Sequence, residues 1–80
     1  MNYKEELQAE VDRLEILKSA ESAFAKALVD NYGIYGTQFS VVNGQEYSAL
    51  DVQGIKVECV KIITEYEDKI ARLKAKINIL

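Results

Sequence analysis

The chain of 80 residues contains no histidine, no proline and a single cysteine. Without histidine and with one thiol, the usual zinc and transition-metal sites cannot be assembled, and a disulfide within one chain is excluded. Without proline, no helix is forcibly kinked. The four glycines match neither the GxxxxGK[ST] nor the GxGxxG phosphate-binding pattern. We therefore expect neither a metal nor a bound cofactor.

Charge and hydropathy exclude two further classes of protein. A net charge of −3 excludes a generally basic nucleic-acid binder. The longest apolar runs are only a few residues, too short for a membrane span or a signal-peptide core. We expect synthesis and function inside the cell, as a single small domain over residues 1–80. Such a core supplies only a few kcal/mol, so self-association would help.

The segment 37–51 carries the strongest local signal. Asn43-Gly44 is typical of a β-hairpin turn because both residues tolerate positive φ, and β-favouring residues surround it. We favour a three-residue loop, 42–44, with Gly44 in the left-handed position, because this register places the hairpin's apolar residues on one face. The hairpin is predicted over about 37–48, and that shared face would consist of Phe39, Val41 and Tyr47.

Helical patterns flank the hairpin on both sides. Before it, residues 3–30 have apolar side chains at three- and four-residue steps, which predicts a long amphipathic helix that ends at Asn31 or Gly33. After it, Ser48 and Asp51 are spaced as a capping box, and a second helix is predicted over about 49–77. Its stripe from Ile63 to Leu80 resembles a coiled-coil seam.

Three features of the second helix carry specific expectations. Cys59 lies on the apolar stripe and should be a buried thiol facing the first helix. Val52, Val57 and Val60 widen the stripe near the hairpin, where we expect more surface to be covered. Gly54 is the weak point of the helix, and we expect it to permit close packing of the hairpin or the connector.

These elements predict an α+β fold: two long antiparallel α-helices with a β-hairpin between them, in the order α-β-β-α. Residues 1–30 carry seven acidic and four basic side chains, whereas Lys69–Lys76 is a basic end. In an antiparallel pair this end would lie beside the acidic start of the first helix. Charge matching between the helices is the simpler interpretation, and contact of the basic end with DNA or an acidic protein is the alternative.

Such a short hairpin would cover only one end of the helical pair. We therefore expect the apolar stripes at the other end to be incompletely covered within a monomer and to dock on a partner or a second copy. The residues predicted to form this interaction surface are Leu7, Val11, Leu14, Ile70, Leu73 and Ile77.

Catalysis is not indicated by the sequence. Pairs that could formally act as general acid and base occur at helical i, i+3 spacing, namely Glu65 with Asp68 and Glu58 with Lys61, but on what should be a solvated face. Cys59 has no histidine to activate it. We expect the protein not to be an enzyme and to have no catalytic residues.

The hairpin FSVVNGQEYS, the helix start SALD and the run YEDKIARLK together resemble the phage head–tail joining proteins typified by the W protein of lambdoid phages (gpW). The resemblance covers roughly residues 27–74. It implies a small α+β protein that assembles as a ring beneath the portal of a filled capsid. The chain departs from the family in its longer first helix and in ending without a polar tail.

The leading functional hypothesis is therefore a phage or prophage structural adaptor, a head–tail connector or neck component, found in the host cytoplasm or in the virion. Its partners would be proteins, including further copies of itself. The alternative is a small regulatory coiled-coil protein, such as an inhibitor or antitoxin-like module, that docks on a host protein or on itself. A nucleic-acid-binding hairpin is disfavoured because residues 37–48 contain no Lys or Arg.

Overall fold

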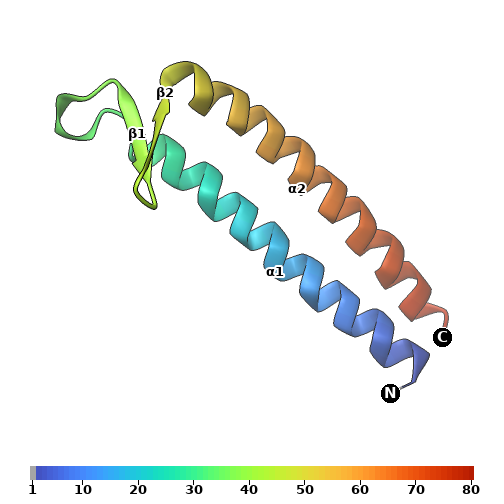
Figure 1. The fold of residues 1–80 in the computed structure, drawn as a ribbon. Coiled ribbons are helices and arrows are strands. Elements are labelled where there is room, and N and C mark those ends of the chain that lie inside the picture. The colour runs from blue at the N-terminus through green and yellow to red at the C-terminus, as the bar shows by residue number, and fades with distance from the viewer. Residues whose placement is uncertain (1) are drawn as a thin grey trace.

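A computed structural model describes residues 2–80, except for the side chain of Tyr35. Two long helices lie antiparallel, and a β-hairpin joins them at one end, while the two termini meet at the other end (Figure 1). The predicted α-β-β-α arrangement is confirmed. The molecule measures 55 × 20 × 13 Å. In chain order the elements are α1 (Tyr3–Asp30), a 3-10 turn (Ile34–Gly36), β1 (Phe39–Val42), β2 (Gln45–Ser48) and α2 (Ala49–Asn78).

Local side-chain chemistry sets the ends of the helices. The Asn2 side chain caps α1 by accepting a hydrogen bond from the Glu5 backbone N–H at 2.8 Å. At the other end Gly33 takes the left-handed conformation with φ 78°, whereas Asn31 keeps φ −87°. Glycine adopts positive φ without the steric cost that a Cβ brings, so Gly33 is the residue that redirects the chain after α1.

The predicted capping box of α2 is present. Ser48 Oγ accepts from the Asp51 N–H, and the Asp51 carboxylate accepts from the Ser48 N–H, each at 3.1 Å. Two N–H groups that lack helical partners are thereby satisfied at the junction between β2 and α2. The junction therefore needs no loop residue, and α2 follows directly from the strand.

The predicted hairpin register is wrong. Val42 pairs with Gln45, and Ser40 pairs with Tyr47, so the loop contains only Asn43 and Gly44. Both loop residues have positive φ, 53° and 79°, as in the two-residue turn whose twist matches that of the strands. The shorter loop reverses the expected facing of β1.

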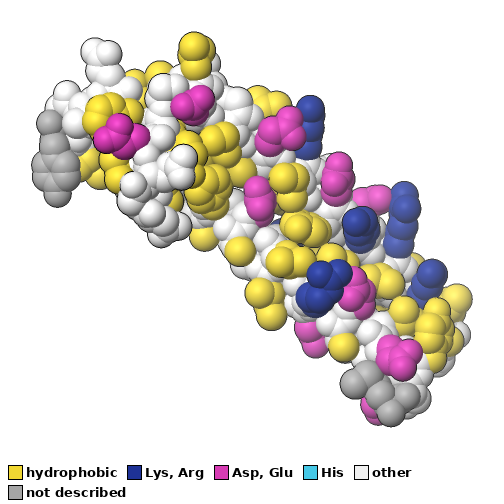
Figure 2. Space-filling model, in the orientation of Figure 1, with side chains coloured by type: hydrophobic (Ala, Val, Ile, Leu, Met, Phe, Trp, Pro, Cys, Tyr) yellow, Lys and Arg dark blue, Asp and Glu magenta, His cyan; other side chains and the backbone are white. Residues whose placement is uncertain are grey.

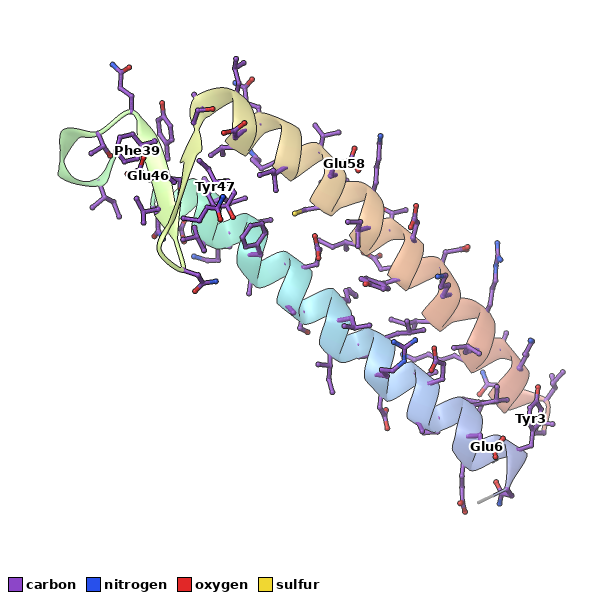
Figure 3. All side chains as sticks on the ribbon, viewed as in Figure 1. Tyr3, Glu6, Phe39, Glu46, Tyr47 and Glu58 are labelled. Atoms are coloured by element: carbon purple, nitrogen blue, oxygen red, sulfur yellow. The ribbon has the colours of Figure 1, made fainter. Side chains whose placement is uncertain are left out.

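The two faces of the hairpin have different neighbours. Ser40 and Val42 are buried on the helical side, where Tyr47 makes an edge-on contact with Phe24 at 5.9 Å between ring centroids. Phe39 lies on the side toward the connector (Figure 3), and it lines a hollow there together with Ile34 and Val41. A single apolar face is therefore not formed, because the connector after α1 offers the second face a partial cover.

The core consists of two clusters along the seam between α1 and α2. The first lies near the termini and contains Val11, Leu14 and Ile70. The second lies beneath the hairpin and contains Leu28, Val42 and Val52. Each fully buried aliphatic side chain contributes roughly 1.5–3 kcal/mol relative to exposure. The whole length of the pair is thus held by apolar contacts, not only the end that the hairpin covers.

Candidate interaction surfaces

The six residues predicted to form an exposed interaction surface lie in the seam between the helices. Leu7, Val11, Leu14 and Ile70 are buried, at 8%, 2%, 3% and 5% exposure. Leu73 and Ile77 are partly buried against the same cluster. The expectation that the stripes at this end remain uncovered within a monomer is therefore wrong for the four buried residues. The helices pair along their full length, so each stripe covers the other.

The basic end of α2 lies beside α1, as the charge pattern suggests. Lys74 Nζ is 3.6 Å from the Glu15 carboxylate across the seam. Glu10 accepts hydrogen bonds from Arg13, and these bonds, together with the nearby charges of Arg13 and Lys69, lower the pKa of the Glu10 carboxyl. These pairs are exposed and therefore contribute little to stability. Of these pairs, Lys74–Glu15 joins the two helices, whereas Glu10–Arg13 lies within α1.

Apolar side chains that are exposed gather on the outer face of α2. Leu50, Val57 and Val60 are 80%, 57% and 63% exposed. Val57 and Val60 line a shallow hollow of about 300 Å³, with Lys56 and Lys61 at its edges. We call Leu50, Val57 and Val60 the α2 patch. The sequence predicts that Val57 and Val60 lie where the hairpin covers α2, but both are exposed. Val52, from the same predicted group, is buried at 7% exposure.

The outer face of α1 carries a second apolar surface. Ile16 is 70% exposed, and Ala9, Ala20 and Ala23 are also exposed. Ile16 lies two residues from the buried Leu14, a rotation of about 200° around the helix, so it points away from α2. We call these four residues the α1 patch. The sequence pattern does not predict this patch, because Ile16 does not follow the seam's periodicity.

Two hollows flank the hairpin. One of about 330 Å³ lies between the end of α1 and the start of α2, with Val29, Tyr32, Val52 and Lys56 in its lining. The other, of about 380 Å³, lies between the connector and β1 and includes Ile34, Phe39 and Val41. Among the side chains drawn in Figure 2, Lys and Arg lie along the helices and not over the hairpin. On the face that Figure 2 shows, the hairpin end carries apolar, neutral and acidic side chains.

Two carbonyls on the free edge of β1 accept hydrogen bonds from within the chain. The Asn31 side-chain amide donates to the Val41 carbonyl at 2.9 Å, and the Gly33 N–H donates to the Phe39 carbonyl at 3.3 Å. An edge strand with open N–H and C=O groups would accept an added strand. Because these carbonyls are already occupied, β1 is a poor site for strand addition.

Cys59 is the one thiol, and it is 1% exposed, so its predicted burial is confirmed. Its Sγ–H donates to the Glu21 carboxylate across the seam, at 3.3 Å. Burial, together with this carboxylate, raises the pKa of the Cys59 thiol to about 11. Because the thiolate is the nucleophilic form, the thiol has little reactivity near neutral pH.

Residues 2–80 contain neither a group of metal ligands nor a membrane-spanning helix. Within that range, no three His, Cys, Asp or Glu side chains are grouped so that they could hold a metal ion. Neither α1 nor α2, taken over the same residues, is long and apolar enough to cross a membrane.

Comparison with known proteins places the chain in no group: no protein-family model, no curated protein and no solved structure matches it.

Proposed function

We propose that the protein is a structural adaptor of a phage or prophage particle, a connector or neck component that acts through protein–protein contacts. The observation that carries the proposal is the α-β-β-α layout, with a β-hairpin closing one end of two long helices. The resemblance to the head–tail joining proteins implies this layout. Apolar patches on the outer faces of both helices supply surfaces for such contacts.

The chemistry of the described side chains supports a role without catalysis. The only thiol is buried and has a raised pKa. Glu58 and Lys61 form an exposed ion pair at 3.5 Å on the outer side of α2, and Asp68 pairs with Arg72 at 2.9 Å in the same way. Each of these charged side chains is therefore paired with another one on the outer surface of the helix. We accordingly propose that the protein is not an enzyme and works without a cofactor.

Deletion of the gene in its own host tests the adaptor function. After particle production is induced, the deletion strain should accumulate filled heads and separate tails, and expression of the intact chain should restore joined particles. Electron microscopy of the lysate measures the joined fraction. Normal numbers of joined particles from the deletion strain would exclude this function. Immunolabelling of restored particles should place the protein at the neck and show that it leaves the host cytoplasm in the virion.

A second candidate is a regulatory binding protein that docks on one host protein. The observation favouring it is the hollow of about 330 Å³ at the hairpin end, which combines Val29, Tyr32 and Val52 with the cation of Lys56. Such a hollow suits an apolar side chain that is followed by an acidic group. The native mass separates the two functions: an adaptor enters an assembly of many copies, whereas a regulator forms a small complex with a single target.

A further inference from the structure

We propose that the outer side of α2, near the hairpin, binds an amphipathic helix of another protein that carries acidic side chains beside its apolar ones. The binding surface, which we call the α2 groove, consists of two neighbouring hollows, one of about 330 Å³ at the end of α1 and one of about 300 Å³ over Val57 and Val60. Lys56 lines both hollows, so they adjoin along the helix. The inference rests on the proposed function, since both require a protein partner, and it specifies the chemistry of that partner.

The lining of the α2 groove is largely apolar and open to solvent. Val57 and Val60 are 57% and 63% exposed, and Val29 and Tyr32, at the end of α1, are 45% and 40% exposed. Exposed apolar side chains that are rimmed by polar ones are typical of a surface that binds another protein. Burying them stabilises a complex by about 25 cal/mol per Å², from which the costs of association are subtracted.

The charged groups that line the α2 groove are basic. Lys56 lies between the two hollows, and Lys61 lies at the far edge of the second one. No acidic side chain is among the described residues that line either hollow. Lys61 approaches Glu58 at 3.5 Å, whereas Lys56 takes part in none of the ion pairs found within residues 2–80. A carboxylate of a partner could therefore pair with Lys56 without breaking an ion pair of this chain.

The acidic residues nearest in the sequence face elsewhere. At about 100° of rotation per residue, Asp51 and Glu58 lie on the opposite flank of α2 from Lys56. On α1, the Asp30 carboxylate pairs with Lys26. Interactions between exposed charges are largely screened beyond about 8–10 Å at physiological salt. The net charge of −3 for the whole chain therefore does not describe the α2 groove.

A helix fits the α2 groove better than an extended strand. The backbone N–H and C=O groups of α2 are used within the helix, so a strand would find no edge to pair with, whereas a helix satisfies its own backbone groups. The α2 residues that line the hollows span 49–56 in the first and 56–61 in the second. The two centres therefore lie about six residues, or about 9 Å, apart along α2. Side chains seven positions apart on one face of a helix are separated by about 10.5 Å, whereas those on one face of a strand recur at about 6.7 and 13 Å.

This geometry specifies a sequence pattern for the partner helix. Two apolar residues seven positions apart would enter the two hollows. An Asp or Glu four positions after the first apolar residue would lie between them, beside Lys56. A second acidic residue, three or four positions beyond the second apolar one, would lie beside Lys61.

A synthetic peptide with this pattern tests the proposal. We would titrate a helical peptide of about 18 residues, with leucine at both apolar positions and glutamate at both acidic ones, into ¹⁵N-labelled protein and follow the amide resonances by NMR. Shifts should concentrate on the residues that line the two hollows and should be absent around Ile16, on the outer face of α1. Two control peptides should bind at least about threefold more weakly, one with lysine in place of both glutamates and one with its leucines five positions apart, on different faces.

Three variants of the protein sharpen the test. Lys56→Glu should lower the affinity for the acidic peptide at least about threefold and raise the affinity for the lysine peptide. Val57→Asp should weaken binding of the acidic peptide by about tenfold. Lys4→Glu, at an exposed site near the start of α1, changes the net charge equally and should bind like wild type. Circular dichroism checks that each variant is folded.

Several results would overturn the proposal. These are no shifts at millimolar peptide, equal binding of the acidic and lysine peptides, or an unchanged affinity in Lys56→Glu. If the same resonances shift when the protein alone is concentrated, and the peptide does not compete, a second copy covers the groove instead. If anionic phospholipid vesicles shift them and the peptide does not, the groove binds a membrane surface and not an acidic helix.

Failure of this proposal is distinguishable from failure of the adaptor function. If the deletion strain fails to join heads and tails but expression of Lys56→Glu or Val57→Asp restores joining, the α2 groove is not the surface that the adaptor uses, while the adaptor function stands. If deletion leaves joined particles at normal numbers, the adaptor function fails, and the NMR titration still decides whether the groove binds an acidic helix.

Discussion

Replacing Gly54 with alanine should stabilise the protein. Gly54 lies within α2, its φ is not positive, and a Cβ built on it meets no atom within 4 Å. The close packing expected from the sequence is therefore absent at this position. In an exposed helix interior, glycine is about 0.8–1 kcal/mol less favourable than alanine, chiefly because its unfolded chain has more freedom to lose.

The expected gain is large enough to measure. For a domain of this size, 1 kcal/mol corresponds to a shift in Tm of roughly 4–8 °C. Thermal unfolding followed by circular dichroism, at a low protein concentration that limits association, gives the shift. Chemical denaturation should give the same gain through its midpoint, with an unchanged slope.

Gly44→Ala is the matched control, since it makes the same chemical change at φ 79°. There the Cβ is strained, and the variant should lose about 1 kcal/mol or more. We therefore expect Gly54→Ala to raise the free energy of unfolding and Gly44→Ala to lower it. A Gly54→Ala protein that is equally stable or less stable than wild type would refute it and would indicate that the glycine serves a close approach.

Three other predictions concern the turn, the thiol and the seam. At Gly44, valine should destabilise strongly and asparagine only mildly, because asparagine tolerates positive φ; equal urea midpoints for the two variants would contradict the turn geometry. Cys59→Ala should cost about 1 kcal/mol, on the scale of small core truncations, and native Cys59 should react slowly with thiol reagents. The pKa of Cys59 in the folded protein, about 11, lies above the ordinary 9.0, so the folded state holds the thiol proton more tightly than the unfolded state does. The resulting contribution to the free energy of unfolding is intact below pH 9 and is lost as pH rises toward 11. The Cys59→Ala variant should lack that part of the loss in a pH series of unfolding free energies. Leu14→Lys should unfold the helical pair, since Leu14 is 3% exposed, whereas Ile16→Lys, at 70% exposure, should leave stability within about 0.5 kcal/mol; similar losses for both would show that the seam is misassigned.

The sequence was most informative where chemistry is local. The capping box of Ser48 and Asp51 needs only residues three apart, and the predicted helix ends fall within a residue of those observed. The seam was also predictable, because the regular spacing of Val11, Leu14 and Ile70 marks one side of each helix.

The predictions that were wrong depended on contacts between segments that are distant in the sequence. The hairpin register was chosen to unite Phe39, Val41 and Tyr47 on one face, but the connector around Ile34 folds back toward β1 and partly covers a second face. A connector this short has no periodic pattern from which its folding back toward β1 could be predicted. Likewise, the exposure of Val57 depends on where the hairpin sits over the helices, which the pattern of α2 alone does not specify.

The closed and open ends of the helical pair differ in how far apart their contacting residues lie along the chain. Leu28 and Val52, beneath the hairpin, are joined by a short intervening segment, whereas Val11 and Ile70 are separated by most of the molecule. Closing a short loop costs less chain entropy than closing a long one. Folding should therefore begin at the hairpin and proceed toward the termini, and amide protons near the termini should exchange sooner than those around Leu28. The hairpin end should therefore stay closed while the two helices separate locally near the termini.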